Sequence, residues 1–527
     1  MKMKKFLSLL LSIAMLISVF CVIPVSAEGD EIKADTSWYV ESGETFTLTN
    51  AADLLGFASL ASSNSFKGQT ILLGDDITLN TGNASTWGTV APAYSYSAEF
   101  KWNKAFQGTF DGQGHTISGL YIPSNTSHGS AMFRYVEGTA VIKNFTLTNS
   151  YIAGSKCSGA IVGKFAGGTV AAKSLTLSDV HVTSTTVTGT DTMVGGLAGT
   201  VQATTADNAT VVIENCSFAG KVTSSANEPG GLIGDAQKLT SLDIRNSYVD
   251  VELSYTGTTA GTGIGGLVGY IDRANANIQD CMITGSITAT AGSTGVSSLI
   301  GYITSKGTSE VKVECNRILL AVESETADTL VGTVNSELAP YITYSASNIV
   351  YDSSLVAENL PISVGTTTLN ATGDTTANLK GTDAGFANWL VVASDYPLPK
   401  APKVIGYQTT AVADGTYSLR LVAVIYGGGC TSAGFKNFTV TADSKTTTAA
   451  DYECSYVYTS ITGGGNTYKA SDFGGTYFMT VEIYDIPETI TSFNISMAPY
   501  VRDAANNEMA GSNQSYTIDV SDSEDSD

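Results

Sequence analysis

The sequence predicts an all-β protein, in which a right-handed parallel β-helix (a solenoid) with an N-terminal capping helix is followed by an antiparallel Ig-like β-sandwich. Three observations support this. A glycine-rich phrase recurs through the middle of the chain, the segments between its copies alternate with a period of two, and the last part of the chain keeps that alternation without the phrase. A repeat of 20–50 residues is typical of solenoids, and period-two alternation is typical of strands.

The repeated phrase is Gly-Gly-Leu-x-Gly. Full copies occupy 195–199, 230–234 and 265–269, and weaker copies lie before and after them. The central apolar residues of the six copies are Ile161, Leu197, Leu232, Leu267, Leu299 and Leu330, which gives steps of 36, 35, 35, 32 and 31. We expect these residues to point inward and to stack on one another about 4.8 Å apart. The glycines are expected to supply the positive φ of coil corners.

Short strands fill the space between the phrases. Residues 211–213 and 242–244 are examples, and each is followed by a second β-rich run. Three short strands per repeat fit one coil of a parallel β-helix, and crossover geometry favours the right hand. A polar column accompanies the strands, and we expect its amides to bond along the column as structural groups. Its predicted members are Asn149, Asp179, Asn215, Asn246 and Asp280.

The chain begins like an exported protein. Three lysines in the first five residues precede an apolar run from 6 to 23 and a small-residue site ending at Ala27, which predicts a signal peptide over 1–27. An uncleaved anchor is the alternative. Removing those lysines from 27 basic residues leaves 24 against 49 acidic residues, a net charge of −25. This charge argues against nucleic acid and anionic membranes as partners, and no membrane insertion is expected after cleavage.

The rest of the chain divides into four predicted parts. Residues 28–396 form the β-helix, covered at its start by a helix that Asn50 caps, because an open coil would expose strand edges. Residues 397–403 are a proline-rich linker. Residues 404–518 form the sandwich. Residues 519–527 form an acidic, disordered tail without an anchor.

Six cysteines remain after cleavage of the signal peptide. Cys216 and Cys281 occupy equivalent places two coils apart, about 9.6 Å, which is too far to bridge, so they are expected to be core residues. Cys430 and Cys454 are the plausible disulfide, although free thiols are an equal alternative.

Residues 106–120 read Phe-Gln-Gly-Thr-Phe-Asp-Gly-Gln-Gly-His-Thr-Ile-Ser-Gly-Leu. This run and the repeats after it resemble, over about residues 44–400, the bacterial cell-surface β-helix proteins that carry GLUG motifs. The resemblance implies an extracellular, adhesion-associated protein. Near 297–335 the copies lose their leading glycine pair and depart from that pattern. Residues 406–423 resemble a module at the C-termini of exported clostridial proteins, which implies a Gram-positive source.

The sequence contains few candidates for catalysis. It has three histidines and lacks His-Glu-x-x-His, Cys-x-x-Cys and phosphate-binding Gly-Lys-Ser/Thr motifs. We therefore predict no catalytic residues, no cofactor and no metal. His115, in the order Gly-His-Thr, is expected to lie at a corner or on the surface.

Polysaccharide cleavage, by a lyase or glycoside hydrolase of the β-helix type, is the enzymatic alternative. Such enzymes need acids beside a basic residue, or two carboxylates. The candidates are Asp243 with Arg245, Asp272 with Arg273, and Asp280. Stacked coils place acids about 4.8 or 9.6 Å apart in any acidic solenoid, so this spacing does not distinguish an enzyme from a non-catalytic solenoid.

The predicted function is non-catalytic extracellular adhesion or ligand binding, with an extracellular glycan or protein as the partner and the solenoid displaying the binding surface. The protein is expected to be secreted or associated with the cell surface. A structural spacer of the cell surface is the further alternative. Tyr456 and Tyr458 would share one strand face of the sandwich, as a sugar-stacking platform or in ordinary sheet packing.

Overall fold

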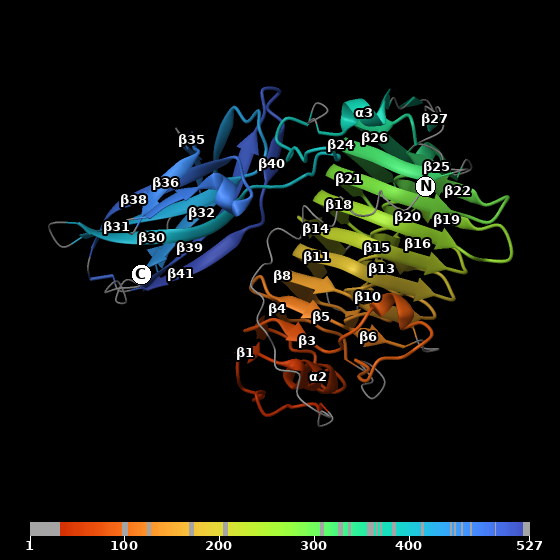
Figure 1. The fold of residues 1–527 in the computed structure, drawn as a ribbon, viewed down its shortest axis with the longest axis horizontal. Coiled ribbons are helices and arrows are strands. Elements are labelled where there is room, and N and C mark those ends of the chain that lie inside the picture. Colours follow the sequence, from red (N-terminus) through yellow and green to blue (C-terminus); the bar gives the residue numbers. More distant parts are fainter. Residues whose placement is uncertain are drawn as a thin grey trace.

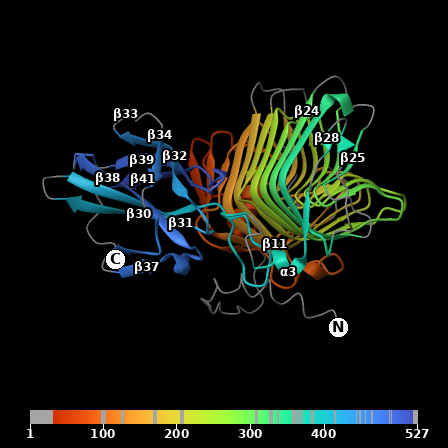
Figure 2. The ribbon, with the colours of Figure 1, turned by 90° about the horizontal axis from the view of Figure 1, so that it is seen from above.

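Two bodies of β-structure lie side by side in the computed structural model (Figures 1 and 2). One is a stack of parallel strands and the other is a set of antiparallel sheets. The structure describes residues 32–96, 104–123, 128–167, 173–203, 209–305, 310–324, 330–335, 339–355, 363–364, 367–368, 371–381, 386–412, 416–442, 445–446, 450–454, 457–463, 466–487, 489–490 and 492–519. The predicted signal peptide and most of the acidic tail lie outside these residues.

Three parallel sheets form the walls of the solenoid, which confirms the predicted fold class. The largest sheet contains β1 (Thr45–Leu48), β2 (Thr70–Leu73), β3 (Ile77–Thr78), β4 (Thr109–Asp111), β5 (Thr116–Ser118), β6 (Tyr121–Ile122), β8 (Thr139–Thr148), β9 (Tyr151–Gly154), β11 (Lys173–Gly189), β14 (Ala209–Glu214), β15 (Ser217–Ser224), β18 (Ser241–Tyr255), β21 (Ala276–Thr288), β24 (Val311–Ser324), β26 (Ile342–Asp352) and β29 (Thr372–Asp374). The second contains β7 (Phe133–Val136), β10 (Val162–Gly167), β13 (Ala198–Ala203), β17 (Ile233–Gln237), β20 (Val268–Asp272), β23 (Ile300–Thr304) and β25 (Val331–Val334). The third contains β12 (Val194–Gly195), β16 (Pro229–Gly230), β19 (Thr262–Gly265) and β22 (Thr294–Ser297).

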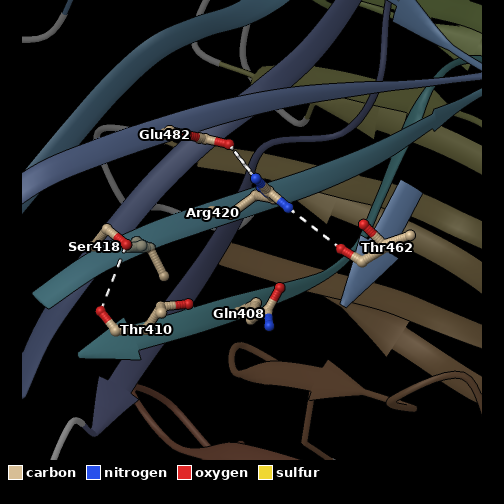
Figure 3. A pocket seen from close by; sticks show the side chains of 7 residues that line it. Gln408, Thr410, Ser418, Arg420, Thr462 and Glu482 are labelled. Carbon is tan, nitrogen blue, oxygen red and sulfur yellow. Dashed lines mark hydrogen bonds and ion pairs between the residues drawn. The ribbon is translucent and has the colours of Figure 1, made fainter. Parts of the chain in front are cut away.

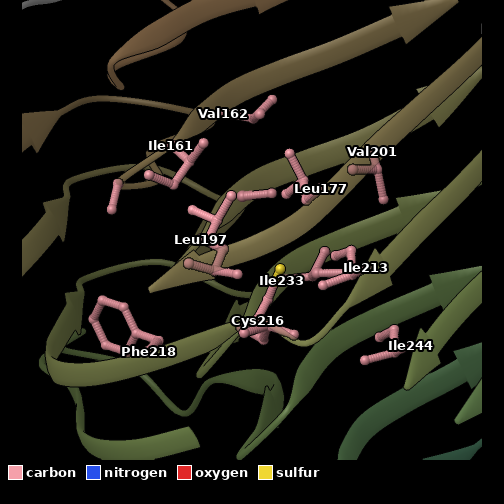
Figure 4. Close-up of a cluster of buried hydrophobic side chains, with 14 of the residues drawn as sticks. Ile161, Val162, Leu177, Leu197, Val201, Ile213, Cys216, Phe218, Ile233 and Ile244 are labelled. Carbon is pink, nitrogen blue, oxygen red and sulfur yellow. The ribbon is translucent and has the colours of Figure 1, made fainter. Parts of the chain in front are cut away.

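The predicted apolar column forms the centre of the core. All six of its members, from Ile161 to Leu330, are buried. The backbone N–H of Leu197 donates to the carbonyl of Leu232 (2.9 Å), and that of Leu232 donates to Leu267 (2.9 Å), so these residues stack coil on coil. Ile161 and Leu197 point into the space between the sheets (Figure 4). Burial of each such side chain contributes roughly 1.5–3 kcal/mol to folding.

The glycines of the repeat serve a different purpose from the predicted one. None of the nine glycines in the three full copies has a positive φ. A Cβ added at Gly231 would lie 1.9 Å from the carbonyl oxygen of Gly266, and one at Gly199 would lie 2.4 Å from the carbonyl carbon of Cys157. The phrase therefore needs glycine because neighbouring backbones pass too close for any side chain.

Positive φ occurs at the polar corner column, where β8, β11, β18, β21, β24 and β26 bend. Its seven residues have φ between 45° and 60°; six of them turn the chain within one long strand, and Asn215 turns it between β14 and β15. Asparagine and aspartate tolerate this conformation better than other residues with a Cβ. The members of the corner column are Asn144, Asp179, Asn215, Asn246, Asp280, Arg317 and Asn348.

The assignment of Asn149 to this column was wrong. Lys143 pairs with Ser178 and Phe145 with Val180, so the residue beside Asp179 is Asn144. Asn149 lies in the turn after β8, where its amide bonds Ala84 N and Gly82 O around the 3-10 helix η2 (Ala84–Thr86). The prediction failed because this coil has two asparagines with a positive φ, and Asn149 lies five residues beyond the one that belongs to the column.

Helix α2 (Ala51–Leu60) covers the first coil, as predicted. The Asn50 side chain accepts from Asp53 N (3.0 Å) in the first turn, and the Asp53 carboxylate accepts from Thr49 N (2.8 Å) just before the helix, which is a reciprocal cap. Phe57 contacts the rings of Phe66 and Phe106 in the core below. At the other end of the solenoid lie η3 (Ala339–Tyr341), the pair β27 (Ser363–Val364) and β28 (Thr367–Thr368), and α3 (Thr376–Leu379).

The C-terminal strands form a sandwich of two antiparallel sheets with a small hairpin. Leu419 and Leu421 of one sheet share a core with Phe493 and Ile495 of the other. The first sheet contains β30 (Lys403–Val412), β31 (Thr416–Ile425), β35 (Val457–Tyr458) and β38 (Tyr477–Pro487). The second contains β32 (Ser432–Ala442), β33 (Lys445–Thr446), β34 (Ala450–Cys454), β39 (Ser492–Arg502), β40 (Glu508–Ala510) and β41 (Gln514–Asp519). The hairpin is β36 (Ser460–Gly463) with β37 (Asn466–Lys469), followed by η4 (Ala470–Phe473).

The cysteines are free thiols in the described residues. Cys216 and Cys281 are buried in the core, as predicted. Cys430 and Cys454 are not bridged, and Cys454 Sγ instead contacts the carbonyl of Thr480 (3.2 Å). Among the described residues, no helix has the length and apolar character needed to cross a bilayer.

Candidate functional site

Asp243, one of the acids proposed for polysaccharide cleavage, does not pair with its expected base, Arg245. Arg245 binds Glu214 of the preceding coil, with Nε and Nη2 at 3.0 and 2.5 Å from Oε2. Asp243 accepts a long hydrogen bond from Asn277 (3.4 Å). The expected Asp243–Arg245 pair is therefore replaced by a structural ion pair between coils.

The remaining acidic candidates are enclosed. Asp272 is 1% exposed and binds the neighbouring Arg273, with Nη2 at 3.1 Å. Asp280 is also 1% exposed and forms an ion pair with Arg317 of the next coil. Burial raises the pKa of Asp280 to about 7, against the opposing charge of Arg317. Neither carboxylate faces solvent, where a polysaccharide would have to approach.

The other residues singled out from the sequence also lie apart. His115 is on the first coils, with Nδ1 3.4 Å from an oxygen of Asp76. Tyr458 is half-exposed on the short edge strand β35, while Tyr456 lies outside the described residues. Within the described ranges, no group of three or more His, Cys, Asp or Glu side chains is arranged to hold a metal ion.

A polar depression on the outer face of the first sandwich sheet is the candidate site. Gln408 pairs with Arg420 across β30 and β31, and Arg420 pairs with Glu482 across β31 and β38. Thr410 pairs with Ser418 in the next row. Because side chains alternate between the two faces of a strand, these residues share the face opposite the sandwich core.

An ion pair forms the floor of this depression (Figure 3). Arg420 Nε and Nη2 lie 2.7 and 2.6 Å from Glu482 Oε1, and Nη1 lies 3.4 Å from the carbonyl of Thr462 at the rim. The two charged side chains are 37% and 29% exposed, so solvent and ligands can reach both. The depression encloses about 160 Å³, below the roughly 300–1,000 Å³ of drug-sized pockets, and is suited to a single ring or short group.

An aromatic side chain, Tyr484, contacts the ion pair. The Tyr484 hydroxyl donates to Glu482 Oε2, and its ring is 63% exposed. This hydrogen bond, with further help from Arg420, lowers the pKa of the Glu482 carboxyl. The bond to Glu482 and, more weakly, the nearby Tyr452 raise the pKa of Tyr484. The exposed ring of Tyr484 therefore lies beside a set of hydrogen-bonding groups.

Sequence reasoning did not find this site because its residues form no motif. They come from three strands and a hairpin between 408 and 482, and only the fold brings them together. The signal was the alternation Ser418-Leu419-Arg420-Leu421, which predicts an outward-facing arginine in the middle of an apolar strand.

A second polar arrangement joins the sandwich to the solenoid. The turn between β40 and β41 lies along the corner column. Asn246 Nδ2 donates to the carbonyl of Ala510 (2.7 Å), Arg317 Nη2 to that of Glu508 (2.6 Å), and Ser512 Oγ to Asp179 Oδ2. For Asn215 and Asn246, the expected hydrogen bonds along the column are thus replaced by bonds to the sandwich. We call this contact the seam, and together with a buried apolar cluster that includes Met282 and Leu319 it holds the sandwich beside the coils.

The chain matches no protein-family model and no curated protein. A crystal structure of a candidate immunoglobulin A1 protease from Bacteroides ovatus is similar with a TM-score of 0.37 and 16% identity, covering 68% of this chain and 93% of that one. At this level of similarity the match carries no argument about activity.

Proposed function

We propose that the protein is a non-catalytic extracellular ligand-binding protein whose C-terminal sandwich binds glycans and whose solenoid carries that sandwich. The observation that carries the proposal is the accessible Arg420–Glu482 pair with the exposed ring of Tyr484 beside it. Donors, acceptors and an open aromatic face together are the chemistry that binds sugar hydroxyls and the apolar face of a sugar ring.

The burial and ion pairing of the candidate catalytic residues support ligand binding rather than bond cleavage. A glycosidase needs two accessible carboxylates, and a lyase needs an accessible base. Asp272 and Asp280 are enclosed, and Arg245 is held by Glu214. The signal sequence predicted over 1–27 supports an extracellular location.

A glycan array run beside a lyase and glycosidase screen with Ca²⁺ tests the proposal. We expect binding without bond cleavage, and we expect Arg420→Ala to abolish the binding. Asp243→Asn and Arg245→Gln should leave the binding unchanged. Reproducible cleavage lost in either of those two variants would overturn the non-catalytic proposal. Absence of both binding and cleavage would favour a structural spacer.

A further inference from the structure

We infer that the sandwich site selects uncharged glycans and that Glu482 is the residue that excludes acidic ones. This inference rests on the proposed function and adds the chemical class of the ligand. It follows from the charges, the hydrogen bonds and the exposure of the residues that line the depression.

The charges of the lining residues cancel. Arg420 and Glu482 are the two charged groups among the residues that line the depression, and Gln408, Thr410, Ser418 and Thr462 are neutral. Glu482 Oε1 accepts from both Nε and Nη2 of the guanidinium, so the carboxylate already occupies the side of Arg420 that would clamp an anion. An acidic sugar would have to displace this carboxylate or lie beside it.

Glu482 is held in place and held ionised. The Tyr484 hydroxyl bonds its second oxygen, so both carboxylate oxygens have partners. These contacts favour the charged form, and the carboxylate therefore repels a second carboxylate over the ordinary pH range. The whole chain, with a formal charge of −22, adds a weaker repulsion at long range.

The remaining hydrogen-bonding capacity suits neighbouring hydroxyls. A guanidinium has five N–H groups and a carboxylate accepts about four hydrogen bonds, so each side chain keeps unused capacity. The donor and the acceptor lie beside one another, as a vicinal diol requires. The Ser418 hydroxyl is only weakly engaged, at 3.5 Å from the carbonyl of Thr410, and is available to a third hydroxyl.

Calorimetric titration with matched sugars tests the inference. The probes are linear trisaccharides of glucose, galactose and mannose, each beside the trisaccharide of the corresponding uronic acid. We expect the wild-type protein to bind at least one neutral probe, and to bind its acidic counterpart about tenfold more weakly or worse. Glu482→Gln, which keeps the shape and removes the charge, should raise affinity for the acidic counterpart about tenfold by freeing Arg420.

Two further variants distinguish a change in charge selection from a general loss of folding or binding. Arg420→Gln combined with Glu482→Gln should lose the acquired uronate binding. Glu252→Gln removes the acid of the exposed Lys221–Glu252 pair (2.6 Å) on the solenoid and should leave the preference unchanged. Added salt should weaken uronate binding by Glu482→Gln and spare neutral binding, because the acquired contact is ionic. Circular dichroism checks that each variant is folded.

The outcomes distinguish the inference from the proposed function. Uronates bound as tightly as neutral sugars by the wild type, with loss in Arg420→Ala, would overturn the charge selection and leave glycan binding intact. A folded Glu482→Gln protein without acquired uronate binding would also overturn the inference. If no trisaccharide and no array glycan binds, the proposed function itself fails.

Discussion

The hydroxyl of Ser512 donates a hydrogen bond to the carboxylate of Asp179, 333 positions earlier in the chain. Asp179 takes its left-handed conformation for a reason internal to the solenoid, which is the bend within β11. The sandwich uses the side chains that this bend projects outward. A corner that the solenoid needs for its own geometry thus also serves as the docking surface for the last strands.

Replacing Ser512 by aspartate should release the sandwich from the solenoid. The seam is polar, and three of its buried atoms, Asn215 Oδ1, Asn246 Oδ1 and Arg317 Nε, have no hydrogen-bond partner among the described residues, which weakens it. A second carboxylate against Asp179 adds repulsion. Small-angle scattering should show a larger radius of gyration. Ser512→Ala, which loses about 0.5–1.5 kcal/mol of bonding, should keep the docked shape. An unchanged radius in Ser512→Asp would mean that the seam does not hold the sandwich.

Shortening one member of the apolar column should destabilise the solenoid. Leu267→Ala leaves a cavity in a core that cannot collapse around it, and should lower the free energy of unfolding by about 2–5 kcal/mol. Denaturant unfolding measures the loss. Val391→Ala, at a side chain that is 48% exposed, should cost little. Equal stabilities of the two variants would contradict the inward column.

A single methyl group in the repeat should prevent the coils from stacking. Gly231→Ala places a Cβ 1.9 Å from the carbonyl oxygen of Gly266, and the clash is not relieved without moving the backbone of one coil away from the next. We expect little folded protein. Gly406→Ala, where no atom lies within 4 Å of the added Cβ, should express and melt like the wild type. A stable Gly231→Ala protein would show that the coils are farther apart than described.

Asp235 should make the solenoid less stable as the pH rises. Burial, and then the charge of Glu228, raise the pKa of Asp235 from 3.8 to about 7. The folded state therefore favours the protonated acid. The free energy of unfolding should fall by up to about 1.4 kcal/mol per pH unit as the pH rises through the window from 3.8 to about 7, and stay lower above it.

Asp235→Asn, which mimics the neutral acid, should remove that part of the pH dependence. Asparagine can keep a bond to Thr200, whose hydroxyl lies 2.7 Å from Asp235 Oδ2. Denaturant unfolding near pH 5 and near pH 8 compares the two proteins, and Glu41→Gln, at an exposed carboxyl, is the control. If wild type and Asp235→Asn change equally between the two conditions, Asp235 does not titrate in this window.

The parts predictable from sequence are those that repeat. Leu197, Leu232 and Leu267 recur at a near-constant spacing because each coil needs the same contact, and one sequence therefore carries several copies of the signal. The wrong assignment of Asn149 shows the limit, because two asparagines of one coil take a positive φ and spacing alone does not tell which of them belongs to the column. The helix signal at Asn50 is local and was read correctly.

The burial of Asp280 and the assembly of the sandwich site were not predictable in this way. Asp280 is covered through Arg317, which binds the carbonyl of Glu508, 191 positions away from that arginine. Arg420 meets Glu482 only through the pairing of β31 with β38. No period or motif encodes contacts between such distant, unrepeated segments. Only the three-dimensional arrangement of the strands reveals them.

A ligand footprint by amide hydrogen exchange tests most directly whether the sandwich is the binding surface. The wild-type protein is compared with and without the array glycan that it binds most tightly. We predict slower exchange in peptides that cover 408–420 and 482–484, with no change along the solenoid and no shortening of the glycan. Protection confined to the solenoid strands, or release of a cleaved product, would contradict the proposal.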